Sequence, residues 1–270
     1  MATDAWPTGS IVHIELYSDD LAATRRFYED AFGWSSDPVE GMDDYVMWEA
    51  PDPPYGGFVD GEAVAFPAPS TLCYVDVDDL ASTVEAIAEA GGEVLVGEQS
   101  VPGMGAFVVF RDPGGVVEAA WEARPGSELA GEETPRPSET PAPGSVVHFE
   151  LYTEDVAATR AFHEAVFGWT FEAVSDGGYT VARPPGPPAG GLMPASDEWP
   201  AGTLTYLLVD SAAAATRSVA SAGGHVLREP FDVEGWGTMA VFEAPGGVVG
   251  AVWEAAPMAE ESPTEAAPER

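Results

Sequence analysis

Hydrophobic and polar positions alternate along residues 10–17 and then change to helical spacing, which predicts a strand followed by a helix. One face of the strand is apolar and suits a covering helix, with Val12, Ile14 and Leu16. The opposite face is mixed and suits the wall of a pocket, with Ile11, His13, Glu15 and Tyr17. We expect Ser18 to cap the helix and Gly33 to end it.

Three short strand candidates follow this helix, at 34–38, 44–49 and 56–60, so the first unit is βαβββ. A second unit of the same order is expected from the pattern of the next fifty residues. It comprises a strand at 71–77, a helix at 79–90, and strands at 93–99, 106–111 and 116–121.

The whole plan then occurs a second time. Residues 9–34 (GSIVHIELYSDDLAATRRFYEDAFGW) and 144–169 (GSVVHFELYTEDVAATRAFHEAVFGW) are identical at 17 of 26 positions. A duplication of this length indicates two copies of one domain. We therefore expect domains at 1–122 and 144–255, a Pro- and acid-rich linker at 123–143, and a disordered acidic tail at 256–270.

The charge of the chain restricts its partners. Ten basic residues, all of them Arg, stand against 46 acidic ones, for a net charge of −36. This charge argues against nucleic-acid and anionic-membrane partners and is typical of a halophilic protein. The single Cys73, the absence of a signal-peptide pattern and the lack of a long apolar stretch indicate a cytoplasmic protein. Cys73 alternates with its neighbours so as to face the helices, as a small buried hydrophobe.

Two βαβββ units per domain, the HIEL…FGW opening and the DPGG hairpin resemble the vicinal oxygen chelate superfamily. That superfamily includes glyoxalase I, bleomycin-resistance proteins and extradiol dioxygenases. The resemblance covers nearly the whole chain. It implies an α+β fold of two glyoxalase-like domains, each made of two βαβββ modules with curved mixed sheets. It does not specify a reaction.

The resemblance also implies a metal site with one ligand on each of four strands. The first ligand position falls on His13 and His148. The other positions carry no metal-binding side chain: Leu72 and Leu204, Ala119 and Ala251, and the segments 56–60 and 190–194. One imidazole does not hold a divalent metal, so we expect no metal cofactor. A makeshift metal site, with Glu15 beside His13 or Glu150 beside His148, is the alternative.

Other side chains of the same strands are expected to line a cup. His13 with Glu15, and His148 with Glu150, are candidates for a general base with its orienting carboxylate, or else polar groups of a wet pocket. The candidate ligand-binding residues are mostly aromatic, which suits a small-molecule site, although they can equally form core. They are Tyr17, Leu72, Tyr74, Trp121, Tyr152, Leu204, Tyr206 and Trp253. Met104 and Trp236, at the tips of two glycine loops, are candidates to cover the cups.

Two functions follow from these observations. The first is a metal-independent protein, like the bleomycin-resistance branch, that binds a small apolar or aromatic metabolite. The second is a metal-dependent lyase or isomerase of the glyoxalase I (lactoylglutathione lyase-like) type. A dioxygenase comes third, because its iron needs two His and one carboxylate. We expect a monomer with pseudo-dimeric domains or a homodimer.

Overall fold

The computed structural model describes residues 6–62, 64, 71–124, 137–174 and 178–256. Much of the expected linker and nearly all of the expected tail lie outside these ranges, so the domain boundaries remain predictions. In the described residues no helix is long and apolar enough to cross a membrane.

The first half forms one eight-stranded sheet in the order β2-β3-β4-β1-β5-β8-β7-β6. The two βαβββ units meet edge to edge, because β1 pairs with β5 antiparallel at the centre of the sheet. The elements of this half are β1 (Ile11–Ser18), α1 (Leu21–Phe32), β2 (Ser35–Pro38), β3 (Tyr45–Glu49), β4 (Tyr55–Asp60), β5 (Thr71–Asp76), α2 (Leu80–Glu89), β6 (Glu93–Val101), β7 (Gly105–Arg111) and β8 (Val117–Ala123).

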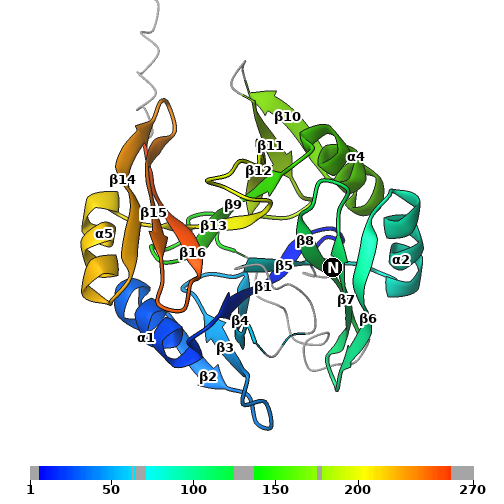
Figure 1. Ribbon diagram of the computed structural model, residues 1–270, viewed down its shortest axis with the longest axis horizontal. Coiled ribbons are helices and arrows are strands. Elements are labelled where there is room, and N and C mark those ends of the chain that lie inside the picture. The colour runs from blue at the N-terminus through cyan, green and yellow to red at the C-terminus, as the bar shows by residue number, and fades with distance from the viewer. Residues whose placement is uncertain (1–5, 63, 65–70, 125–136, 175–177, 257–270) are drawn as a thin grey trace, which may run out of the picture.

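The second half repeats this plan in a sheet of order β10-β11-β12-β9-β13-β16-β15-β14. The chain is therefore an α+β tandem, as the sequence predicts. The elements are β9 (Val146–Thr153), α4 (Val156–Phe167), β10 (Thr170–Val174), β11 (Tyr179–Arg183), β12 (Ala189–Pro194), β13 (Gly202–Leu208), α5 (Ala212–Ser221), β14 (His225–Val233), β15 (Gly237–Glu243) and β16 (Val249–Ala255). In Figure 1 the central strands of both sheets, β1, β5, β9 and β13, lie near the middle of the molecule, and the outermost strands lie at its periphery.

Two local expectations are wrong in detail. The N-cap of α1 is Asp20, whose side chain accepts a hydrogen bond from the Ala23 amide, and Ser18 lies outside the helix. Ile11 faces the helices and is fully buried in the main core, because a register shift lies between Ile11 and His13 in the ladder with β5. Strict alternation therefore fails at the start of β1, while Ile14 and Leu16 face the core as expected.

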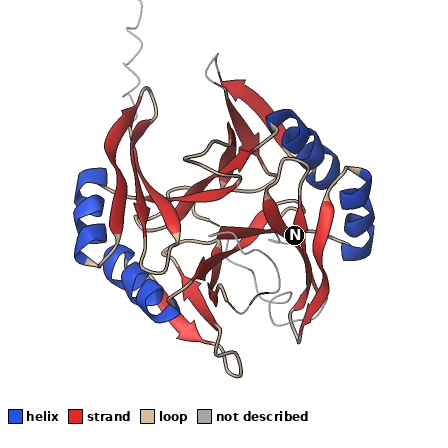
Figure 2. Cartoon of the chain, in the orientation of Figure 1, coloured by secondary structure: helices blue, strands red, loops and turns tan. Residues whose placement is uncertain are grey.

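The helices lie on the outer flanks of the sheets and pair across the two halves (Figure 2). α1 of the first half contacts α5 of the second, and α2 contacts α4. Each opening helix also packs on the sheet of the opposite half: Phe27 lies 5.6 Å from Phe242, and Phe162 lies 5.6 Å from Phe110, between ring centroids. One continuous apolar cluster consequently spans both halves.

The repeated sequence motifs make reciprocal contacts between the halves. In the glycine turn after β7 the Gly114 carbonyl accepts a hydrogen bond from the Glu154 amide at 2.9 Å, and the matching Gly246 carbonyl accepts one from the Asp19 amide at 3.0 Å. A Cβ at Gly114 would overlap the hydroxyls of Thr153 and Thr159, so only glycine permits this approach. The two glycine turns therefore join the domains, and they contribute no group to the cups.

Candidate functional site

Each sheet has a second apolar cluster on the face opposite the helices, and we call this face the cup. In the first cup, the centre of the floor is built from β1 and β5. His13 lies opposite Tyr74 across these strands, and Glu15 lies opposite Leu72. The members of the first cluster include Tyr17, Val59, Leu72, Tyr74, Val109 and Ala119, with Tyr45, Phe107 and Trp121 packed against them.

A hydrogen-bond network joins the polar groups of the first cup. His13 Nε2 lies 2.9 Å from the Tyr45 hydroxyl, and the Tyr17 hydroxyl donates to Glu15 Oε2 at 2.6 Å. His13 Nε2 and Glu15 Oε1 are 4.0 Å apart, and the His13 ring meets Tyr74 edge to face at 5.3 Å. The floor thus combines one imidazole, one carboxyl group and several phenols within a small area.

Burial changes the proton affinity of these groups. Desolvation lowers the pKa of His13 to about 4, so the ring is neutral at neutral pH. Desolvation raises the pKa of Glu15 to about 6, against the opposing effect of hydrogen bonds from Tyr17 and Tyr74. The cup therefore offers a neutral imidazole and a carboxyl group that exchanges its proton near pH 6.

Tyr45 occupies the space above β4. Gly57 lies opposite Glu15 on β4, and a Cβ there would overlap the phenol ring of Tyr45. The adjacent Gly56 leaves room for Trp48 on the helix side in the same way. The repeated Gly-Gly pair thus lets an aromatic ring lie flat on each face of the strand.

The second cup repeats this arrangement. His148 Nε2 lies 2.9 Å from the Tyr179 hydroxyl, and Gly191 makes room for that ring. Glu150 Oε2 accepts from Tyr152 at 2.9 Å and from Tyr206 at 2.6 Å. Burial again lowers the pKa of His148, to about 4, and raises that of Glu150. In this cup Trp199 stacks on Tyr152, with the ring centroids 5.7 Å apart.

The structure brings the predicted site residues together in two separate groups, one in each half. Leu204, Tyr206 and Ala251 belong to the second cup cluster, with Tyr152 and Trp253 packed against it. Sequence analysis did not single out Tyr45, Tyr179, Phe107 and Met239, which also face the cups. The sequence predicts a strand over 44–49, and the alternation of side chains along that strand identifies Tyr45 as the phenol on the face of His13. Of the two loop-tip residues, Trp236 is 54% exposed.

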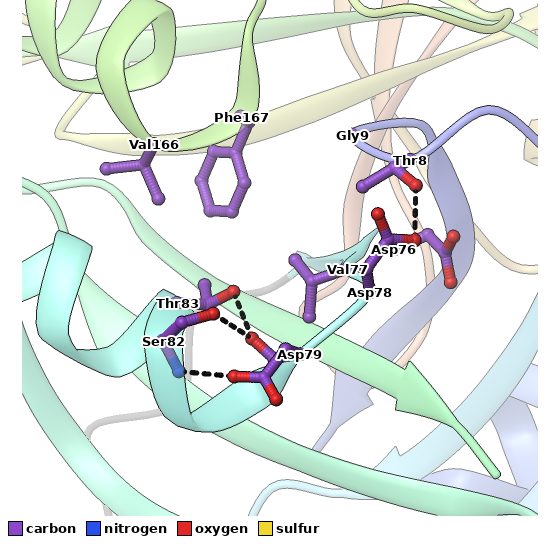
Figure 3. A pocket seen from close by; sticks show the side chains of 10 residues that line it. All are labelled: Thr8, Gly9, Asp76, Val77, Asp78, Asp79, Ser82, Thr83, Val166 and Phe167. Atoms are coloured by element: carbon purple, nitrogen blue, oxygen red, sulfur yellow. Dashed lines mark hydrogen bonds between the residues drawn. The ribbon is translucent and has the colours of Figure 1, made fainter.

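A hollow of about 260 Å³ lies outside the cups, where the start of α2 faces the end of α4 (Figure 3). Several of its polar groups are already engaged: Thr8 donates to Asp78 at 2.7 Å, and Asp79 accepts from the Ser82 amide at 2.6 Å as the cap of α2. The other lining groups are mainly acidic or apolar, as with Asp76 and Phe167. The combination of imidazole, carboxyl group and phenols is found in the cups, and we place the candidate site there.

The fold agrees with the sequence comparisons. The sequence profile of the Glyoxalase/Bleomycin resistance protein/Dioxygenase superfamily matches residues 10–117 and 145–251. The chain belongs to this superfamily. It is 30% identical to CFP32 of Mycobacterium tuberculosis, named as a glyoxylase, over 90% of this chain and 94% of that protein. It is 38% identical to the anthracycline biosynthesis protein DnrV of Streptomyces peucetius, over 42% of this chain and 47% of DnrV.

Solved structures of superfamily enzymes share the fold. The Mn(II)-bound glyoxalase from Novosphingobium aromaticivorans superposes with a TM-score of 0.64 at 14% identity, covering 92% of this chain and 83% of that one. The 2,3-dioxygenase LapB from Pseudomonas sp. KL28 superposes with a TM-score of 0.61 at 15% identity, covering 91% and 92%. At these identities the likeness concerns the fold.

The superfamily implies a divalent metal, and the cup residues do not fit one. The strands facing His13 present Leu72, Ala119 and Gly57, and the space above Gly57 is filled by Tyr45. In the described residues no group of three or more His, Cys, Asp or Glu side chains is arranged to hold a metal ion. A protein metal site commonly uses three or four such donors.

Proposed function

We propose that this superfamily member binds a small apolar or aromatic metabolite in its cups, without the four-ligand metal site. The observation that carries the proposal is the filling of the ligand positions. Leu72 and Ala119, and likewise Leu204 and Ala251, are buried apolar groups where a metal site needs donors.

The aromatic walls favour a planar ligand. Tyr74 and Phe107 meet edge to face at 5.5 Å beside Trp121, and a flat ring can stack against such groups. A few polar groups at the base of an otherwise apolar pocket are typical of small-molecule sites. The partial match to a protein named for anthracycline biosynthesis is in keeping with an aromatic ligand.

A metal-dependent lyase or isomerase of the glyoxalase I type is the second candidate. It is favoured by the His–Glu pair of each cup, with 4.0 Å between His13 Nε2 and Glu15 Oε1. Against it, His13 Nε2 already lies within hydrogen-bond distance of a phenol, and so does Nε2 of His148.

Metal content and ligand binding distinguish the two candidates. The protein, kept in high salt, is treated with chelator and titrated calorimetrically with methyl 1-hydroxy-2-naphthoate, a neutral planar aromatic probe. A second sample is dialysed against Mn²⁺, Zn²⁺ and Ni²⁺ and its bound metal is counted by elemental analysis. We expect the probe to bind without metal and the metal count to be near zero.

Histidine variants provide the control. One or two metals per chain, lost in His13→Ala and His148→Ala but kept in His225→Ala, would overturn the binding-protein proposal in favour of the lyase. His225 is the matched control because it is exposed on β14. Failure of the metal-free protein to bind the probe would also count against the proposal.

A further inference from the structure

The two cups differ at one end of an otherwise matching row of side chains. The row crosses the sheet from the central strand to the outer edge, one residue per strand, as the strand pairing dictates. In the first half it runs His13, Tyr74, Ala119, Val109, Val96. In the second half it runs His148, Tyr206, Ala251, Val241, Arg228. Only the last position changes, from an apolar side chain to a cation.

This last position faces the cup. Val96 packs against the first cup cluster, and its pairing partner Val109 belongs to that cluster. Arg228 pairs with Val241, a member of the second cup cluster. Directly paired residues of neighbouring strands project to the same side of a sheet, so Arg228 projects from the rim on the cup side.

An aromatic side chain holds the guanidinium in place. Cζ of Arg228 lies 4.1 Å from the ring centroid of Phe231. Phe231 pairs with Met239, which packs against the cup cluster, so both side chains belong to the same wall. Stacking on an aromatic face positions a guanidinium and leaves its N–H groups free to bind a carboxylate in a bidentate manner.

Arg228 is one of the described arginines that form no ion pair, and it is the one at the cup rim. Four other arginines, Arg25, Arg111, Arg160 and Arg183, form ion pairs with glutamates at 2.8–3.1 Å. Within the described ranges no carboxylate lies within ion-pair distance of Arg228. Its charge therefore remains available to an anionic group entering the cup.

The second cup is also less covered at this rim. Leu95 packs against the first cup cluster beside Val96. Leu227, the matching residue of the second half, is 50% exposed. The first cup thus closes this wall with its own aliphatic side chains, whereas the second presents a cation and an uncovered leucine.

We propose that the second cup binds a planar aromatic carboxylate, with the carboxylate on Arg228 and the ring system against the part-exposed Met239 and Trp253, which pair beside the buried row. An oxygen substituent at the other end of the ligand would meet His148 and Tyr206. Four strand spacings of about 4.8 Å separate the two ends of the row, roughly 19 Å along the curved sheet. The Arg228 side chain and the His148 and Tyr206 side chains reach inward from the two ends. The length that remains between them fits two or three fused rings. The assignment rests on the proposed function, since it specifies the ligand class of the same cup.

A pair of probes tests the role of the charge. 1-Hydroxy-2-naphthoate carries the carboxylate, and its methyl ester is the neutral counterpart. Both are titrated calorimetrically into chelator-treated protein at constant salt. We expect one strong site per chain for the acid, at least tenfold tighter than for the ester.

Three variants locate that site. Arg228→Gln should weaken the acid at least tenfold and leave the ester within twofold. Arg217→Gln removes the same charge from the exposed face of α5 and should change neither probe. Val96→Arg copies the rim of the second cup into the first and should strengthen binding of the acid there, giving two comparable sites.

Different outcomes overturn different claims. Equal affinities for acid and ester, or an acid affinity that Arg228→Gln leaves unchanged, would overturn the carboxylate assignment while the proposed function stands. Binding of neither probe would overturn the proposed function and this assignment together. A loss of acid affinity in Arg217→Gln as large as in Arg228→Gln would mean that net charge, and not the cup, attracts the probe.

Discussion

Replacing Glu118 by glycine should destabilise the protein strongly, because it would leave a buried cation without its partner. Glu118 on β8 and His163 on α4 belong to different halves, and both side chains are fully buried. His163 Nε2 lies 2.7 Å from Glu118 Oε2, and its Nδ1 lies 2.8 Å from the Thr159 carbonyl. Since that carbonyl can only accept, Nδ1 carries a proton, and a carboxylate at Nε2 favours the doubly protonated ring.

The magnitude follows from burial. Breaking a fully buried ion pair by removing one partner costs about 3–5 kcal/mol. For a protein of this size that corresponds to a fall in Tm of roughly 10 °C. We expect a loss of this order for Glu118→Gly, measured by urea unfolding at pH 6 in constant KCl with tryptophan fluorescence and circular dichroism.

The chain supplies its own uncharged version of this contact. Alignment of the repeats places Tyr28 at the position of His163 and Gly250 at that of Glu118. Tyr28 is buried in the same core, and among the described residues no charged side chain is paired with it. The double variant Glu118→Gly/His163→Tyr should therefore recover at least half of the free energy lost in Glu118→Gly. His163→Tyr alone should be destabilising, because it leaves the buried Glu118 carboxylate without its partner.

The pH dependence has a definite sign. Burial acts to lower the pKa of His163, but the charge and hydrogen bond of Glu118, together with Asp112, outweigh it and raise the pKa. The stabilisation is thus fully present below the unfolded pKa of about 6.5 and is lost as pH rises through the raised folded value. The reasoning would be refuted if Glu118→Gly cost less than about 1 kcal/mol at pH 6, or if the double variant were as unstable as the sum of the singles.

Three further predictions concern the cups and the surface. Gly57→Ala should cost about 1–3 kcal/mol of folding free energy, because the added Cβ overlaps Tyr45. Gly97→Ala is the control and should change stability little, because the space around Gly97 is open. Equal effects of the two substitutions would contradict this steric account. The imidazole of His13 should titrate near pH 4 by NMR, since burial lowers its pKa. Because of this shift the folded protein should lose stability as the pH drops from about 6.5 to 4, and His13→Gln should remove this pH-dependent loss. Raising KCl should raise Tm because it screens the net charge of −36, and a Tm independent of salt would argue against halophilic adaptation.

The pattern of the chain by itself determined the elements, the duplication and the fold class. Period-two and period-3.6 patterns are local properties, so they predict strands and helices without knowledge of their partners. They also placed His13, Glu15 and Tyr17 on one face of a strand, and the structure brings Tyr74 and Leu72 beside them.

Only the tertiary structure decided which groups from distant strands meet. Strict alternation from the core-facing Val226 would turn Arg228 toward the helices, but a register shift between them turns it to the cup. The same kind of shift moved Ile11 into the core. The placement of Tyr45 over Gly57 likewise depends on the pairing of β3 with β4.

The joining of the halves was also invisible in the sequence. His163 and Glu118 are 45 residues apart and come from different repeats, and their contact depends on α4 packing over the opposite sheet. Periodicity describes a segment relative to its own axis. Bulges, register and domain packing arise from contacts between segments, and the chemistry of both cups depends on them.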